Sequence, residues 1–199
     1  MVLKEYYWIF NRALSESICE EIIKEGEKNK RKLGVTHNTK IKTRKQIKEL
    51  KKIRNSDVIW LEKRWIYQTI MPYIGTANRN AGWNFEYSWA EPIQFTIYKK
   101  NQFYDWHQDC GENVYKSRDV NWNNKIRKLS VTVSLTDPKE YTGGELEIAI
   151  PSKKTKIHTL KLNKGTVVVF PSFVWHRVKT IKSGKRNSLV NWIMGKPWQ

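Results

Sequence analysis

Apolar and polar residues alternate with a period of two through the second half of the chain, in short segments bounded by turn residues. Segments with this alternation are rich in β-branched and aromatic residues, and they span 93–98, 129–135, 145–150, 166–170, 175–178 and 187–193. Turn signals such as Asp137-Pro138 and Gly143-Gly144 separate them. Because no helical pattern intervenes, this half is expected to fold as an antiparallel sandwich or barrel.

The first half of the chain shows a helical period instead. Apolar residues recur every four positions in 14–30 and in 58–74, which predicts a helix in each segment. Pro72 is expected to end or bend the second helix. A length of 199 residues fits one domain. We therefore predict an α+β fold in which a helical part, 1–90, packs on a core of antiparallel strands, 91–199.

Composition excludes several classes of protein. Ten Trp and an aromatic content of 13% are incompatible with global disorder. Cys19 and Cys110 are the two cysteines, too few for a disulfide framework or a cysteine-based zinc finger. The sequence contains no apolar stretch of the roughly 18 residues that a membrane span needs, and its start lacks the order of a signal peptide. A cytoplasmic protein without a membrane partner is expected.

Positive charge is concentrated in one segment. The chain has 37 Lys and Arg against 19 Asp and Glu, and residues 28–54 hold twelve of these cations with one acid, Glu49. Such a segment can attract nucleic acid or another acidic partner. A solvated surface segment is the simpler interpretation, because no nucleic-acid-binding motif accompanies the charge.

Three side chains have the spacing of a metal site. His107 and Asp109 are two residues apart, so in an extended segment they project from the same face. His176 follows on a later predicted strand. This order is typical of the 2-His-1-carboxylate facial triad, which holds Fe(II) and leaves positions open for a chelating cosubstrate and O₂. An H-x-D pair by itself is more often a surface pair, so the metal site is a hypothesis that needs further support.

Arg186 provides that support. It lies ten residues after His176, at the start of the last predicted strand. Its guanidinium could bind a carboxylate through two hydrogen bonds. A dicarboxylate that chelates iron at one end needs such a cation at the other end. In 129–135, Ser130, Thr132 and Ser134 share one face, which is either a solvent face or the lining of a polar cavity.

Together these motifs resemble the Fe(II)/2-oxoglutarate-dependent dioxygenases, in the prolyl 4-hydroxylase branch, and the smaller PKHD-type hydroxylases of bacteria and phages. The resemblance covers about residues 92–194. Its elements are a Tyr before the H-x-D, a Gly-Gly-acid-Leu turn, an apolar run ending in Phe-Pro before the distal His, and a closing Arg and Trp. The stretches that contain them are QFTIYKKNQFYDWHQD (94–109), LSVTVSLTDPKEYTGGELEI (129–148) and GTVVVFPSFVWHRVKTIKSGKRNSLVNW (165–192).

The resemblance implies a double-stranded β-helix (jelly-roll) core and a single dioxygenase domain over residues 1–199. It implies Fe(II), 2-oxoglutarate and O₂ as cofactors and cosubstrates, with ascorbate in support. The implied metal ligands are His107, Asp109 and His176, with no catalytic residue beyond the metal centre. Arg186 would bind the distal carboxylate of 2-oxoglutarate.

Further site residues follow from the resemblance and from position. Tyr98, Thr132 and Ser134 match cosubstrate-binding positions, with a core aromatic as the alternative for Tyr98. Leu146 and Trp192 would line the pocket or simply pack in the core. The polar segment after Asp109 is expected to form a loop over the mouth of the site. Trp106, Tyr115 and Trp122, in or beside this loop, would contact substrate or anchor the loop.

The implied activity is hydroxylation of a prolyl residue in a peptide or protein, coupled to decarboxylation of 2-oxoglutarate to succinate, in a bacterium or a phage-infected cell. One alternative is the same chemistry on a nucleic acid, as an oxidative demethylase, with residues 28–54 on the phosphate backbone. Another is a non-catalytic β-barrel binding protein that holds no iron. Iron-dependent formation of succinate separates the last alternative from the other two.

Overall fold

The computed structural model describes residues 3–29, 32–34, 43–111 and 113–198. Helices and strands of the first half of the chain are β1 (Trp8–Phe10), α1 (Glu16–Glu27), β2 (Lys32–Leu33), α2 (Arg44–Ile53), β3 (Arg54–Asn55), β4 (Asp57–Leu61), α3 (Arg64–Asn80), β5 (Trp89–Ala90) and β6 (Ile93–Tyr98). Strands of the second half are β7 (Phe103–His107), β8 (Ile126–Ser134), β9 (Tyr141–Gly143), β10 (Leu146–Ile150), β11 (Lys156–Leu160), β12 (Val167–Pro171), β13 (His176–Val178), β14 (Ile181–Gly184) and β15 (Arg186–Gly195).

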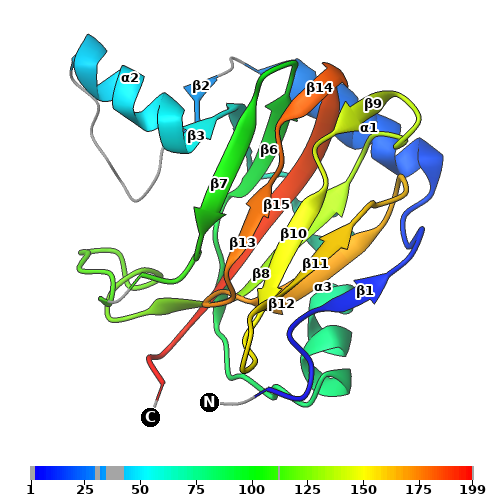
Figure 1. Cartoon of the computed structure of the whole chain (residues 1–199). Helices are drawn as coiled ribbons and strands as arrows, with labels where there is room; N and C mark the ends of the chain where they lie inside the picture. The colour runs from blue at the N-terminus through cyan, green and yellow to red at the C-terminus, as the bar shows by residue number, and fades with distance from the viewer. Residues whose placement is uncertain (1–2, 30–31, 35–42, 112, 199) are drawn as a thin grey trace.

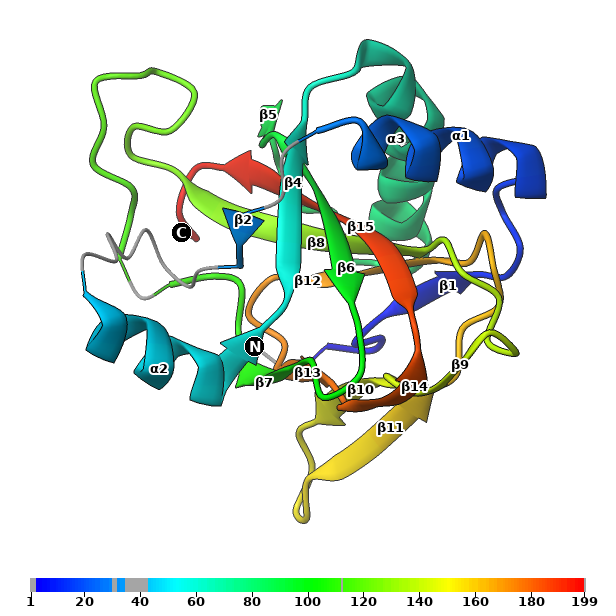
Figure 2. The same cartoon turned by 90° about the horizontal axis from the view of Figure 1, so that it is seen from above.

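Two antiparallel sheets face each other (Figure 1). The larger sheet has the order β1-β12-β8-β15-β6-β4-β2, with β5 paired to β15, and the smaller one has the order β11-β10-β13-β7-β3. Strands β14 and β9 form a separate pair. Helices α1 and α3 cover the outer face of the larger sheet, whereas α2 lies beside β7 at the end of the smaller sheet (Figure 2). An antiparallel β core with helices packed on it is the predicted architecture.

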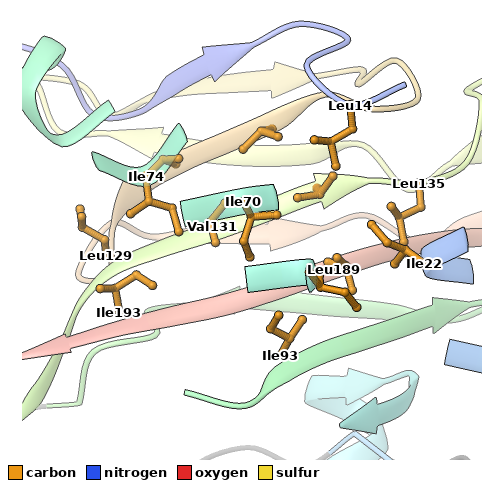
Figure 3. Packing of buried hydrophobic residues seen from close by; sticks show 14 of the residues in the cluster. Leu14, Ile22, Ile70, Ile74, Ile93, Leu129, Val131, Leu135, Leu189 and Ile193 are labelled. Atoms are coloured by element: carbon orange, nitrogen blue, oxygen red, sulfur yellow. The ribbon is translucent and has the colours of Figure 1, made fainter. Parts of the chain in front are cut away.

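The hydrophobic core lies between the larger sheet and its two covering helices (Figure 3). Ile70 and Ile74 of α3 pack there against Leu129 and Val131 of β8. The alternate residues of β8 therefore point the other way, into the space between the sheets. Ser130 and Thr132 are both buried there, so the polar face of this strand is not a solvent face.

The helix predicted over 58–74 is wrong at its start. Residues 58–61 belong to β4, which pairs with β6 in the register Ile59 to Phe95, and α3 begins at Arg64. The same period of four runs through β4 and α3, so it does not distinguish the strand from the helix that follows. Pro72 lies inside α3 and does not end it, since the helix continues to Asn80.

Helix α2 was not predicted, and it lies within the basic segment 28–54. Its N-terminus has a capping box, in which Thr43 accepts from the backbone of Gln46 and Gln46 accepts from the backbone of Thr43. Leu50 is the residue of this helix that is buried. The apolar residues of the helix, Ile47, Leu50 and Ile53, recur every three positions and share one face. Because the segment was interpreted by its charge, that pattern was overlooked. In the part of the chain that the structure describes, no helix is long and apolar enough to cross a membrane.

A substitution at Gly26 can test how closely α1 packs on the larger sheet. A β-carbon at this position would lie 2.5 Å from Cδ1 of Phe95 in β6, whereas one at Gly75 of α3 would meet nothing closer than 3.5 Å. Gly26→Ala is expected to lower the free energy of unfolding by roughly 1–3 kcal/mol through overpacking. Gly75→Ala, the matched control, should raise it by up to about 1 kcal/mol through helix propensity. Urea unfolding of the two variants measures both effects, and a stabilised Gly26→Ala variant would contradict the close packing.

Candidate metal centre

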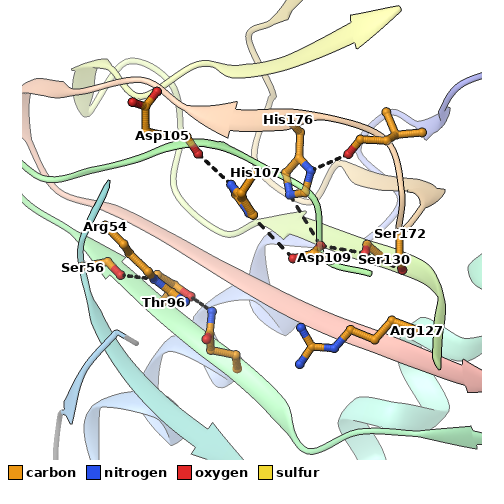
Figure 4. Close-up of polar contacts among 12 residues, drawn as sticks. Arg54, Ser56, Thr96, Asp105, His107, Asp109, Arg127, Ser130, Ser172 and His176 are labelled. Atoms are coloured by element: carbon orange, nitrogen blue, oxygen red, sulfur yellow. Dashed lines mark hydrogen bonds and ion pairs between the residues drawn. The ribbon is translucent and has the colours of Figure 1, made fainter. Parts of the chain in front are cut away.

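Pairing of β7 with β13 brings the two histidines together. The strands are antiparallel, and His107, the last residue of β7, lies directly opposite His176, the first of β13. Beyond His107 the chain leaves the strand, and the backbone N–H groups of Asp109 and Cys110 both donate to the carbonyl oxygen of Ser172, at 2.9 Å. This attachment holds the Asp109 carboxylate next to both imidazoles (Figure 4).

Nitrogen and oxygen atoms of the three side chains converge on one point. Nε2 of His107 lies 3.7 Å from one carboxylate oxygen of Asp109, and Nε2 of His176 lies 3.5 Å from the other. A ligand atom from each residue lies within 4.8 Å of the other two. Such a set of two imidazoles and one carboxylate suits a first-row divalent metal such as Fe(II), with coordination positions left open.

Backbone carbonyls orient both imidazole rings. Nδ1 of His107 lies 2.7 Å from the carbonyl oxygen of Asp105, and Nδ1 of His176 lies 3.0 Å from that of Val174. Because a carbonyl can only accept, these contacts place the ring proton on Nδ1 and leave a lone pair on Nε2. That tautomer is the one required of a metal ligand that binds through Nε2.

The electrostatic surroundings keep these ligands in the protonation states that bind metal. Burial lowers the pKa of His107 well below its usual value, and His176 lowers it further. Burial raises the pKa of Asp109, but the two histidines, Arg127 and a hydrogen bond from Ser130 outweigh that effect and bring it to about 2. At neutral pH His107 is therefore neutral and Asp109 is ionised.

Two hydroxyl groups support the carboxylate from the inner face of the sheet. Oγ of Ser130 donates to Oδ2 of Asp109 over 2.7 Å, and Oγ of Ser172 lies 2.9 Å from Oγ of Ser130. The sequence placed Ser130 on the polar face of its strand without giving it a function. That alternation was the signal from which a supporting role could have been predicted.

A cavity opens beside the three ligands. Of the residues predicted for the site, Tyr98, Thr132, Leu146, Arg186 and Trp192 line it together with His107, Asp109 and His176. Ser188 and Val190, which share a strand face with Arg186, also line it. Arg54, Gln94, Tyr104, Phe170 and Val178 line it without having been predicted. Tyr104 stacks on the ring of His107, with 3.4 Å between ring centroids.

Arg186 is the cationic wall of this cavity. Its side chain is 2% exposed, and Nη1 donates to Oγ of Ser188 over 3.3 Å. It forms no ion pair with a carboxylate of the residues that the structure describes. A buried guanidinium is costly unless an anion compensates it. The cavity therefore suits an anionic ligand that reaches from the metal ligands to Arg186.

Four of the predicted residues lie away from the cavity. Ser134 is the last residue of β8, beyond the cavity, where its hydroxyl meets the carbonyl oxygen of Thr136 at 3.5 Å. Trp106 lies under the guanidinium of Arg177, on the outer side of β7. Tyr115 and Trp122 pack on each other, and Trp122 packs on Trp89, so these two aromatics anchor the loop that follows Asp109.

His158 and Cys19 lie outside the site. His158 is on β11, where Nδ1 is 3.0 Å from the hydroxyl of Tyr7. Cys19 is buried in α1. His37 lies outside the described residues.

Residues 93–194 match the family model described as the 2OG-Fe(II) oxygenase superfamily. Among curated proteins, a PKHD-type hydroxylase of Psychrobacter sp. (strain PRwf-1) is 35% identical over 102 residues, which are 51% of this chain and 37% of that protein. The chain spans about two fifths of the length of the curated relatives that it matches.

Two solved structures show the fold. A viral collagen prolyl hydroxylase from Paramecium Bursaria Chlorella virus-1 superposes with a TM-score of 0.69 at 21% identity, over 96% of this chain and 97% of that one. A prolyl hydroxylase from Trichoplax adhaerens superposes with a TM-score of 0.71 at 16% identity, over 96% of this chain and 84% of that one. The shared fold is the double-stranded β-helix, and the predicted fold class is confirmed.

Ser130 provides a test of the metal site that leaves all three ligands in place. Ser130→Ala is expected to weaken the binding of Mn²⁺ or Fe²⁺ about 10- to 100-fold, because the carboxylate loses the group that orients it. Ser134→Ala, the same change on the same face of the same strand, should leave the affinity unchanged. Calorimetric titration of the two variants gives the comparison. Equal affinities for both would show that Ser130 does not support a metal ligand.

Proposed function

The chain belongs to the 2OG-Fe(II) oxygenase superfamily, and we propose that it acts as an Fe(II)- and 2-oxoglutarate-dependent dioxygenase that hydroxylates a prolyl residue in a peptide or protein. One observation supports this most strongly. A single cavity has a convergent His-Asp-His set at one side and the buried guanidinium of Arg186 among its walls. These are the two anchors that a chelating dicarboxylate needs.

The donor set fits an iron ion, with His107, Asp109 and His176 as the ligands. Bound Fe(II) would supply, with O₂ and 2-oxoglutarate, the oxidation of a C–H bond coupled to decarboxylation of the cosubstrate to succinate. The protein holds the ligands in a fixed geometry beside a cavity whose lining is largely buried. Leu146, Phe170 and Val178 form the apolar part of its wall.

Arg186 and Tyr98 would orient the cosubstrate. Arg186 and Tyr98 are paired across β15 and β6, and the guanidinium carbon lies 5.6 Å from the centre of the phenol ring. Burial raises the pKa of Tyr98, so the phenol keeps its proton and can donate it in a hydrogen bond. Two donors of this kind match the oxygens of a distal carboxylate. Thr132 adds a further hydroxyl to the same cavity.

Peptide substrates are supported by the relatives. The Trichoplax adhaerens structure is described as a prolyl hydroxylase in complex with a hypoxia inducible factor oxygen degradation domain peptide fragment. The viral structure is described as a collagen prolyl hydroxylase in a 2OG complex. We propose a peptide or protein as the substrate class of this chain by analogy with them.

We also propose that residues 1–199 form a single catalytic domain, whose N-terminal half completes both sheets. Strands β1, β2 and β4 extend the larger sheet and β3 extends the smaller one. A cytoplasmic location and a supporting role for ascorbate stay predictions from the sequence.

The second candidate function is oxidation of a nucleic acid. Helix α2 presents five exposed cations, Arg44, Lys45, Lys48, Lys51 and Lys52, against the single acid Glu49, and it lies beside the β7 strand that ends in His107. A phosphate backbone could bind such a helix. Other basic residues of segment 28–54, Lys40 and Lys42 among them, lie outside the described residues. The complete ligand set argues against the third candidate, a binding protein without iron.

Arg186→Ala tests the cosubstrate anchor. Removing one partner of a buried charge pair costs roughly 3–5 kcal/mol, so the affinity for 2-oxoglutarate should fall by two to three orders of magnitude, with metal binding retained. The control is Lys185→Ala, because Lys185 is the adjacent cation and binds Glu27 at the surface, at 3.0 Å. Calorimetry on Mn²⁺-loaded protein gives both affinities. An unchanged value for Arg186→Ala would show that another cation binds the cosubstrate.

A direct assay separates the candidate substrates. Prolyl peptides and methylated oligonucleotides are incubated with the protein, Fe(II), 2-oxoglutarate and ascorbate, and analysed by mass spectrometry. We expect a gain of one oxygen on peptides, with matching succinate. Product on oligonucleotides alone would favour the second candidate. Asp109→Ala, which removes a metal ligand, is the negative control.

A further inference from the structure

Arg54 is a second guanidinium in the cavity, and it comes from the N-terminal half of the chain. We infer that Arg54 binds the distal carboxylate of the cosubstrate together with Arg186, so that two arginines hold one carboxylate. This inference rests on the proposed function. Arg54 lies outside residues 93–194, the segment that the family model matches.

The position of Arg54 sets it apart from the other cations of its segment. It directly follows α2, whose Lys and Arg side chains are exposed, yet Arg54 itself is 3% exposed. Strand β3 pairs with β7 in the register Arg54 to Tyr104, which attaches it to the strand that ends in His107. Its side chain lines the same cavity as the metal ligands and Arg186.

Neighbouring groups hold the guanidinium in place. Nε donates to Oγ of Ser56 over 3.0 Å, and the guanidinium carbon lies 4.6 Å from the centre of the Tyr104 ring. The backbone of Gly34 covers it, because a β-carbon there would lie 2.6 Å from Nε of Arg54. A cation that is fixed before the ligand arrives loses little further freedom on binding.

Arg54 faces the cosubstrate end of the cavity. Burial raises the pKa of Tyr98, and of the charged groups that act on it Arg54 lowers it most, followed by Arg186. Ser56, which accepts from Arg54, also lowers the pKa of Tyr98. Both guanidinium groups therefore lie near one phenol. At the metal end Arg54 also lowers the pKa of His107, but less than the other groups around that ring, and the arginine that lowers the pKa of Asp109 is Arg127, which is paired with Glu91.

Figure 4 shows the same division of the site. Arg54 and Ser56 lie near Thr96 of β6, whereas Ser130 and Ser172 lie on the far side of Asp109. A ligand chelated at the metal centre that extends away from Ser130 would place its second carboxylate among Tyr98, Arg186 and Arg54. A carboxylate has two oxygens and about four acceptor sites, so it can bind both guanidinium groups at once.

The test compares two ligands that differ at one end. 2-Oxoglutarate and 2-oxovalerate have the same chain length and the same metal-chelating group, but 2-oxovalerate ends in a methyl group. Calorimetry on Mn²⁺-loaded Arg54→Gln should show an affinity for 2-oxoglutarate that is about 10- to 100-fold lower, with the affinity for 2-oxovalerate unchanged. Arg54→Lys should recover part of the loss. Arg44→Gln, the same change at an exposed position of α2, should affect neither ligand.

Two outcomes would overturn the inference: an unchanged affinity for 2-oxoglutarate in Arg54→Gln, or an equal loss for both ligands, which would mean that the cavity has only loosened. If Arg54→Gln does not fold, the same two criteria are applied to Arg54→Lys. This variant retains the positive charge but loses the planar set of N–H donors that can bind both oxygens of a carboxylate. A failure of the proposed function itself would give a different binding result. The unaltered protein would then not bind 2-oxoglutarate, or would bind it independently of Arg186.

Discussion

The pairing of β7 with β13 is the constraint on which the site depends. This ladder places His107 opposite His176, and the ladder between β13 and β10 places Ile148 on the other side of His176. A slip of one residue would turn a histidine out of the cavity, because side chains alternate between the two faces of a strand. The attachment of Asp109 to Ser172, just beyond the end of β12, then adds the carboxylate to a pair that the sheet has already fixed.

Alternation within single strands of the larger sheet serves both stability and chemistry. Leu129 and Val131 face the helices and form the core, while Ser130 and Thr132 face the smaller sheet and form part of the site. Strand β15 repeats this division, with Leu189 in the core and Ser188 at the cavity. The main core is therefore packed against the helices, while the space between the sheets holds the polar site beside a smaller apolar cluster that includes Leu146, Ile148 and Phe170. In an interior lined by fixed, buried polar groups, a cation such as Arg186 acts more strongly on an anion than it would in water.

The sequence predicted what depends on local pattern and missed what depends on pairing between distant segments. The six segments predicted from their period of two all contain strands, since this alternation is a direct consequence of one apolar face. Strands β7, β11 and β14 of the same half of the chain were not predicted. The start of α3 was misjudged because the apolar residues of β4 suit a helix as well as a strand, and only its partner β6 decides. Arg54 was not predicted for the site because it belongs to a run of surface cations, and no feature of the neighbouring sequence distinguishes it from Lys51 or Lys52. Ser134 shares a face with Thr132, but the cavity ends before Ser134. Alternation along one strand shows which face a residue is on, and it does not show how far a cavity extends along that face.

The central claim is that one cavity holds a metal at His107, Asp109 and His176 and a dicarboxylate that extends to Arg186. Anomalous diffraction from crystals grown without oxygen, with Mn²⁺ and 2-oxoglutarate, tests it most directly. The account predicts one strong metal peak at about 2.0–2.2 Å from both Nε2 atoms and the carboxylate, with the distal carboxylate of the ligand within hydrogen-bond distance of Arg186. A metal peak elsewhere, or a ligand whose distal end lies away from Arg186, would contradict it.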